Sequence, residues 1–149
     1  MGSYKKILVG TDGSDTSLIA VDRASALASD NGAELLIVTA YEPAHGSETN
    51  AAATALKEEA YQVFGSAPAE SVLRDAADRA RAAGADKVET RALKGPPVDV
   101  LDQAVADSGA DLLVIGNVGL TSLSGRILGS VPQSVARRSG VDVLIVHTS

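Results

Sequence analysis

Short apolar runs alternate with helix-like segments along the whole chain of 149 residues. Runs such as Leu35–Val38 and Leu112–Ile115 are apolar without interruption, which is typical of strands buried on both faces. The segments between the runs carry capping residues and helical spacing. Strands and helices in alternation favour a parallel sheet with helices on both faces. The sequence therefore predicts a single α/β domain over residues 1–149.

The elements can be placed by residue range. Strands are expected at residues 6–9, 35–38, 88–93, 112–115 and 143–146. Helices are expected at residues 18–29, 98–108 and 131–139, with a strongly amphipathic helix between the break at 65–68 and Gly84, and a weak one at 51–64. The third strand is the least apolar and is expected at a sheet edge. For five parallel strands joined by right-handed crossovers the common order is 3-2-1-4-5, which is a doubly wound sheet.

Glycines follow two of the predicted strands. Gly10 ends the first strand, and after the fourth strand come Gly116, Gly119 and, nine residues later, Gly129–Ser130. Glycine allows sharp turns and leaves no Cβ between main-chain N–H groups and a ligand. A helix starting at Ser130 would add unpaired N–H donors that suit a phosphate. Since the order 3-2-1-4-5 reverses between strands 1 and 4, both loops fall at one predicted ligand site.

The spacing Gly-x2-Gly-x9-Gly-Ser resembles the nucleotide-binding motif of the universal stress protein family, whose fold is adenine nucleotide alpha-hydrolase-like. Residues 7–14, Ile-Leu-Val-Gly-Thr-Asp-Gly-Ser, are similar to that family's first strand and acidic loop. Residues 143–146, Val-Leu-Ile-Val, are similar to its last strand. The resemblance covers the whole chain and is nearest to single-domain mycobacterial members, some of which are associated with cyclic AMP rather than ATP.

The resemblance implies an adenine-nucleotide site assembled from three stretches of chain. It places the glycines and Ser130 around the phosphates and ribose, Asp12 near the adenosine, and the end of the second strand along the base. The predicted nucleotide-binding residues are Gly10, Thr11, Asp12, Thr39, Ala40, Gly116, Asn117, Gly119, Arg126, Gly129, Ser130 and Val131. From the residues alone two other interpretations stay open: Asp12 as an Asx-type turn residue or helix cap, and the glycines as plain turns.

Departures from the family's common pattern bear on the ligand. Asn117 and Val118 stand where the family often has a small hydroxyl residue followed by Arg or His, and Pro132 has no N–H to donate. Arg126 is the clear cation near the motif, and Lys94 is a possible neighbour. The chain has a net charge of −6, and ATP carries more negative charge than cyclic AMP. We therefore expect cyclic AMP to be marginally favoured over ATP, with Mg²⁺ possible alongside ATP.

Composition excludes several function classes. Because the chain has no cysteine, thiol catalysis, disulfides and cysteine-bound metals are excluded. His45 and His147 lie in different contexts, so no metal site is predicted. The acidic balance and 3% aromatic content argue against nucleic-acid binding. No apolar run reaches the roughly 18 residues of a membrane span or resembles a signal peptide, so a cytoplasmic location is expected.

We do not expect the chain to be an enzyme. It lacks a Walker motif and a dinucleotide fingerprint, and no general base is evident beyond Asp12, so ATP hydrolysis should be slow at most. The expectation is a stress-response regulator or a nucleotide sensor or buffer. The alternatives are a slow ATPase of the same fold and a dimeric scaffold that binds no nucleotide. A homodimer is expected to cover the apolar last strand, formed by Val143, Leu144, Ile145 and Val146.

Overall fold

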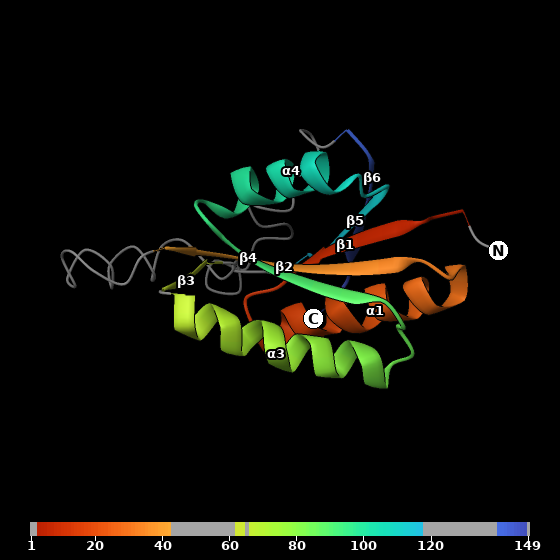
Figure 1. The fold of residues 1–149 in the computed structure, drawn as a ribbon, viewed down its shortest axis with the longest axis horizontal. Helices are drawn as coiled ribbons and strands as arrows, with labels where there is room; N and C mark the ends of the chain where they lie inside the picture. The colour runs from red at the N-terminus through yellow and green to blue at the C-terminus, as the bar shows by residue number, and fades with distance from the viewer. Residues whose placement is uncertain (1–2, 43–61, 65, 118–139, 149) are drawn as a thin grey trace.

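Nine helices and strands occupy the part of the chain that the computed structural model describes, residues 3–42, 62–64, 66–117 and 140–148 (Figure 1). The strands are β1 (Lys6–Gly10), β2 (Glu34–Glu42), β3 (Gln62–Phe64), β4 (Val88–Lys94), β5 (Leu112–Gly116) and β6 (Asp142–Val146). The helices are α1 (Asp15–Asn31), α3 (Ser66–Ala82) and α4 (Pro97–Ser108). None of these helices has the length and apolar character that crossing a membrane requires.

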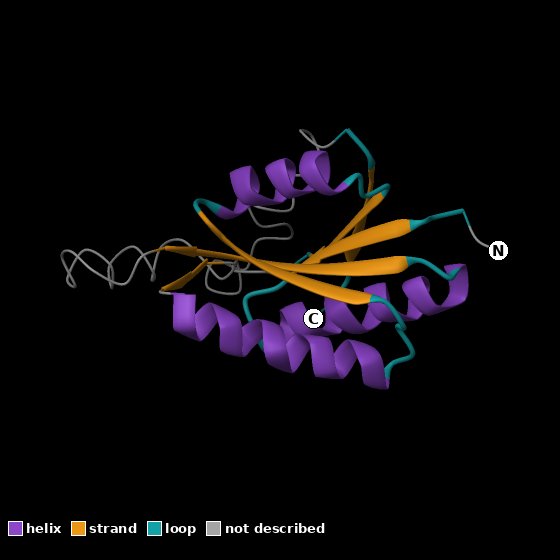
Figure 2. Cartoon of the chain, in the orientation of Figure 1, coloured by secondary structure: helices purple, strands orange, loops and turns teal. Residues whose placement is uncertain are grey.

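The sheet has the predicted strand order. Its five longer strands run β4-β2-β1-β5-β6, and every pairing between them is parallel. Counted along the chain without the short β3, this is the order 3-2-1-4-5. Helices α1 and α3 cover one face of the sheet and α4 lies on the other, so the prediction of a doubly wound sheet is confirmed (Figures 1 and 2). The least apolar strand, β4, lies at an edge as expected.

Strand β3 is a correction to the sequence analysis, which predicted a weak helix over residues 51–64. Residues 62–64 instead form a strand that pairs with Ala40–Glu42. Strand β2 runs to Glu42, beyond its predicted end at Val38, and its last residues pair with β4 as well. Pairing with this extra length of β2 outweighs the weak helical pattern, because strand formation depends on neighbours more than on intrinsic preference. Residues 51–61 lie outside the described residues.

Two helices begin earlier than their patterns suggest. Helix α1 starts at Asp15 because the Ser14 side chain accepts a hydrogen bond from the Ser17 N–H at 3.2 Å. Helix α3 starts at Ser66, inside the stretch that was predicted to be a break. Its Pro68 falls in the first turn, where the missing N–H costs no helical hydrogen bond. Helix α1 ends at Gly32, whose φ of 64° is the left-handed C-cap conformation.

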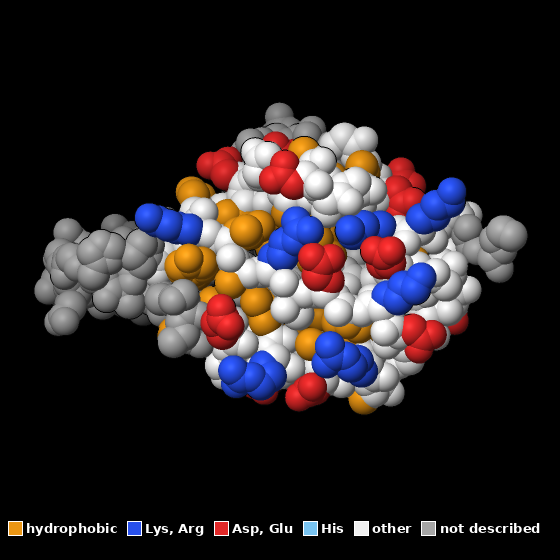
Figure 3. Space-filling view, viewed as in Figure 1, with side chains coloured by type: hydrophobic (Ala, Val, Ile, Leu, Met, Phe, Trp, Pro, Cys, Tyr) orange, Lys and Arg blue, Asp and Glu red, His pale blue; other side chains and the backbone are white. Residues whose placement is uncertain are grey.

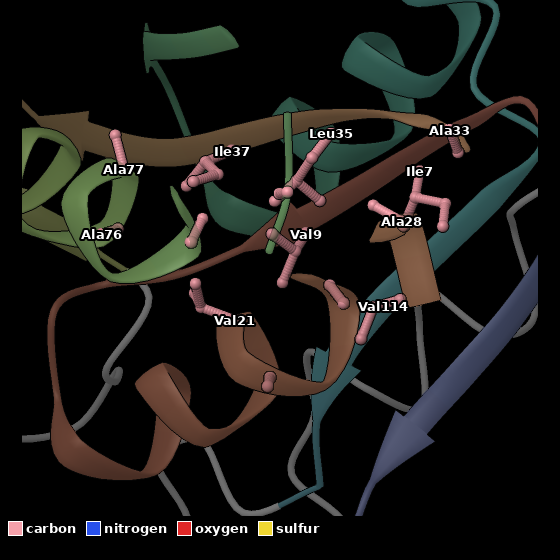
Figure 4. Close-up of a cluster of buried hydrophobic side chains, with 14 of the residues drawn as sticks. Ile7, Val9, Val21, Ala28, Ala33, Leu35, Ile37, Ala76, Ala77 and Val114 are labelled. Carbon is pink, nitrogen blue, oxygen red and sulfur yellow. The ribbon is translucent and has the colours of Figure 1, made fainter. Parts of the chain in front are cut away.

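The core consists of two apolar layers, one on each face of the sheet. On the α1 and α3 face, strand side chains such as Ile7, Val9 and Ile37 point toward the two helices (Figure 4). The two helices contribute small residues to this layer, including Ala28 of α1 and Ala76 of α3. On the α4 face, buried leucines, valines and alanines of the strands pack against Val100, Leu101, Ala104 and Val105. Alanine-rich helix faces let the helices approach closely, so a chain with 3% aromatic residues still fills its interior.

The central position of β1 can be tested by truncating Ile7, which is 0% exposed. Ile7→Ala should lower the free energy of unfolding by about 2–5 kcal/mol, because it removes buried methyl groups and leaves a cavity between β1 and α1. Urea unfolding followed by circular dichroism measures the change. The same substitution at Ile19, which is 38% exposed on α1, is the matched control and should change stability by less than about 1 kcal/mol.

Candidate functional site

The carboxyl ends of β1 and β5 lie side by side at the centre of the sheet, with Val9 paired to Val114. From β1 the chain passes through α1 to β2 on one side, whereas β5 is followed by β6 on the other. The strand order thus reverses between β1 and β5, which is where open α/β sheets bind ligands. The loop after β1 and the described start of the segment after β5 both leave the sheet at this point, as their strand positions require.

The loop from β1 to α1 is held by its own polar groups. The Thr11 N–H donates to the Val38 carbonyl at 3.0 Å, which continues the β1–β2 ladder by one residue. The buried Thr11 hydroxyl lies 2.7 Å from Ser17 Oγ and accepts from the Gly13 N–H at 3.0 Å. Both contacts of the Thr11 hydroxyl are therefore made within the loop. In this structure Thr11, predicted to bind nucleotide, shapes the loop that carries Asp12.

Asp12 is partly exposed at the end of this network. Its Oδ1 accepts from the Ser14 N–H at 2.9 Å, which is the Asx-type turn that the sequence left open as an alternative. No hydrogen bond to Oδ2 is found among the described residues. The turn therefore orients the carboxylate and leaves its second oxygen able to accept a hydrogen bond from a ligand.

Glycines of this loop are required by packing. Gly13 has a φ of 87°, and a Cβ added there would lie 2.9 Å from Val72 Cγ2 of α3. The sequence analysis left Gly13 out of the predicted site, although an Asp-Gly pair is a known turn signal. A Cβ on Gly10 would lie 3.0 Å from Leu101 Cδ2. Gly10 therefore packs closely against α4, and its predicted contact with a nucleotide stays a prediction.

Thr39 and Ala40 do not end their strand as predicted, since β2 continues to Glu42. They face opposite sides of the sheet. Ala40 packs in the layer beneath α4. Thr39 follows Ile37 on the α1 and α3 face, next to Thr11 by the β1–β2 register. Thr39 is 1% exposed, and its Oγ1 has no hydrogen-bond partner among the described residues. Of the two, Thr39 is the one with unused hydrogen-bonding capacity.

Gly116 ends β5 and Asn117 follows it, and both residues are buried. Gly116 pairs with Val146, and the Asn117 N–H donates to the Val146 carbonyl at 2.8 Å. Asn117 Oδ1 accepts from the Thr148 N–H at 2.8 Å and from the Thr148 hydroxyl at 3.1 Å. Asn117 Nδ2 lies 3.4 Å from His147 Nδ1. The side chain predicted to contact nucleotide is thus directed to the residues that follow β6.

The remaining predicted site residues cannot be placed. Gly119, Arg126, Gly129, Ser130 and Val131 lie outside the described residues, as do Val118 and Pro132, whose identities bear on the ligand. Within the described ranges, no group of three or more His, Cys, Asp or Glu side chains is placed to hold a metal ion. Among the described residues of the predicted site, the β1 loop lies beside Thr39 of β2, and β1 itself is paired with β5.

The Asn117 contacts predict a structural role that can be separated from ligand binding. Asn117→Ala removes the acceptor of two buried Thr148 groups and should lower the unfolding free energy by about 1–3 kcal/mol in urea unfolding. Thr148→Ala removes only the hydroxyl contact and should cost less. If Asn117→Ala leaves stability unchanged while weakening nucleotide binding, the side chain serves the ligand and the structural interpretation is wrong.

Sequence comparison identifies the family of this chain. Residues 3–147 match the universal stress protein family. The chain is 53% identical over 149 residues to universal stress protein Rv1636 of Mycobacterium tuberculosis strain H37Rv, with all of both chains covered. It is 33% identical over 149 residues to a putative universal stress protein of Staphylococcus aureus strain USA300, covering 99% of this chain and 87% of the relative.

Solved structures agree as well. A universal stress protein crystallised in complex with cAMP is 49% identical and has a TM-score of 0.77, with 99% of this chain and 100% of that chain covered. A universal stress protein family member from Burkholderia pseudomallei is 27% identical with a TM-score of 0.70, and 98% of each chain is covered. From the match over nearly its whole length and the 53% identical relative, the chain belongs to the universal stress protein family.

Proposed function

We propose that this protein binds an adenine nucleotide at the carboxyl ends of β1, β2 and β5 and acts as a nucleotide sensor or buffer in a stress response. The observation that carries the proposal is the position of Asp12. Its carboxylate stands where the strand order reverses, and the loop fixes one of its oxygens through the Ser14 N–H. The family assignment and the cAMP complex of a 49% identical relative support the same ligand class.

The ribose is the part of the ligand that suits Asp12. A carboxylate oxygen accepts hydrogen bonds from sugar hydroxyls, and one held in place by a turn needs little further ordering to do so. The buried Thr39 hydroxyl, with no described partner, can donate to or accept from an adenine ring nitrogen or amino group. An unpaired buried hydroxyl costs about 1–3 kcal/mol, so a ligand that satisfies it gains affinity.

Among adenine nucleotides, we favour cyclic AMP marginally over ATP. In cyclic AMP the 3′ oxygen is part of the phosphate ring. A single ribose hydroxyl is therefore left for the Asp12 oxygen that has no hydrogen bond among the described residues. Its phosphate also carries a single negative charge. The chain has a net charge of −6, Val118 brings no side-chain donor and Pro132 no N–H, and repulsion grows with ligand charge. Mg²⁺ bound with ATP would reduce this difference.

Calorimetry with cyclic AMP, AMP and ATP, the last with and without Mg²⁺, tests the proposal. Cyclic AMP should bind at least as tightly as ATP. Asp12→Asn keeps the acceptor for the Ser14 N–H but removes the charged oxygen, so cyclic AMP affinity should fall by about tenfold or more. Asp15→Asn makes the same charge change at an exposed position three residues away and should change affinity by less than about twofold.

Each contrary outcome points to a different alternative. If the wild-type protein binds none of the nucleotides, the alternative of a dimeric scaffold that binds no nucleotide is favoured. ATP bound tenfold more tightly than cyclic AMP would overturn the ligand preference and keep the nucleotide site. Sustained phosphate release under ATP would show a slow ATPase in place of a protein that only binds.

A homodimer through β6 is the second part of the proposal. Strand β6 lies at the sheet edge, and Val143, Leu144 and Ile145 are only partly buried within the described part of the chain. A second β6 would cover this apolar edge. Light scattering should therefore give more than the monomer mass, and Ile145→Lys should lower that mass while circular dichroism stays unchanged. An unaltered mass for this folded variant would contradict the β6 contact.

A further inference from the structure

Strand β4 forms the other edge of the sheet. It pairs with Leu35–Tyr41 of β2 along its whole length and with no other strand among the described residues. Figure 1 shows β4 in front, between α3 on one face and α4 on the other. Grooves of about 410 and 330 Å³ flank it on these two faces. A seven-residue edge of this kind presents a row of backbone groups that can pair with another strand.

The backbone of β4 turns alternate residues to its outer edge. The Leu35 N–H donates to the Lys87 carbonyl at 2.8 Å, and the Gly95 N–H donates to the Tyr41 carbonyl at 3.0 Å. In a parallel pair the residues that face the neighbouring strand alternate with those that face away. The odd-numbered residues therefore face β2. The outward backbone groups belong to Val88, Thr90, Ala92 and Lys94.

The side chains of β4 are self-complementary about Thr90. If two copies of the strand pair antiparallel with Thr90 opposite its symmetry mate, Glu89 lies opposite Arg91 of the second copy. Val88 then lies opposite Ala92. The outward backbone groups also meet outward backbone groups in this register. Opposite charges directly across an antiparallel pair stabilise it, and like charges oppose it.

Neighbouring registers are disfavoured by the same residues. A two-fold axis through position 89 would set the two Glu89 carboxylates opposite each other, and one through position 91 would do the same for the two Arg91 guanidinium groups. Glu89 and Arg91 already lie 3.1 Å apart within one chain and are partly exposed, with side-chain exposures of 53% and 34%. In the register centred on Thr90, the two pairs form one group of four alternating charges.

Helix α3 shows the same complementarity one layer below. It contacts both β2 and β4, so two copies related by this axis would place their α3 helices about 10 Å apart, a normal packing distance. The residues of α3 that line the groove beside β4 alternate in charge along the helix: Glu70, Arg74, Asp78 and Arg81. An antiparallel mate reverses this order, so two copies of α3 centred on the middle of this stretch would set opposite charges against each other. Figure 3 shows side chains of both signs interleaved across this face.

From these two patterns we propose that a second copy of this chain docks on β4, strand to strand and antiparallel, about a two-fold axis that passes through Thr90. The contact is separate from the proposed β6 dimer, which lies at the opposite edge of the sheet. Two self-complementary edges on one sheet allow assemblies larger than a dimer. Because the contact uses charged pairs at an exposed edge, it weakens as salt rises.

A disulfide tests the position of the axis, since the chain has no cysteine of its own. In the register above, the two copies of residue 90 have Cα atoms about 5.5 Å apart, within disulfide range. Thr90→Cys should therefore give a disulfide-linked dimer under mild oxidation. Lys87→Cys introduces an exposed thiol on the same edge, but its two copies lie about 20 Å apart and should stay unlinked. No linkage at position 90, or equal linkage at both positions, would overturn the proposal.

Charge reversal tests the partner of each side chain. Glu89→Arg and Arg91→Glu each place like charges across the axis, so the β4 contact should be lost in both variants. Each is made in the Ile145→Lys background, which removes the β6 contact. Light scattering should then give the monomer mass. An equimolar mixture of the two variants restores every opposite-charge pair and should recover the dimer, as should the double variant. If the mixture stays monomeric while the wild-type edge associates, the charge pairing is wrong. Thermal unfolding of each variant separates misfolding from lost association.

Discussion

The parallel pairing of β1 with a strand on each side determines the rest of the structure. Its residues Ile7, Leu8 and Val9 are fully buried, and its backbone is paired with β2 on one edge and β5 on the other. Because β1 is central, its two neighbours lead the chain to opposite halves of the sheet. The reversal of strand order, and with it the position of the proposed ligand site, follows from this single placement. A shift of β1 by one residue would exchange the side chains of both core layers.

The loop of the proposed site satisfies most of its own polar groups. Thr11, Ser14 and Ser17 bond to one another and to the loop backbone, so a turn that would otherwise be mobile is fixed at the start of α1. Gly13 lets this loop close against Val72 of α3. What is left over, one oxygen of Asp12 and the Thr39 hydroxyl, is thereby held in position. Groups that are held before a ligand arrives bind it with less loss of entropy.

The sequence predicted the fold well and the site in part, for physical reasons that differ. Uninterrupted apolar runs such as Leu112–Ile115 identify buried strands whatever surrounds them, and their order follows from general rules of connection. Strand β3 could not be found, because it exists through pairing with the extended end of β2. Spacing places Asn117 beside the predicted ligand site but gives no direction for its side chain. Only the structure reveals that its amide bonds to Thr148 after β6.

The two edge strands of the sheet, β6 and β4, differ in how their exposed backbone groups are protected from pairing with other chains. Strand β6 is short and apolar, so any apolar surface covers it and little selects the register. Strand β4 is longer and carries charges of both signs, which discourages pairing with unrelated strands. Within β4 these charges are also arranged symmetrically about Thr90, with Glu89 and Arg91 on either side. The features that protect this edge from unselective association are therefore the same ones that specify a single register with a second copy.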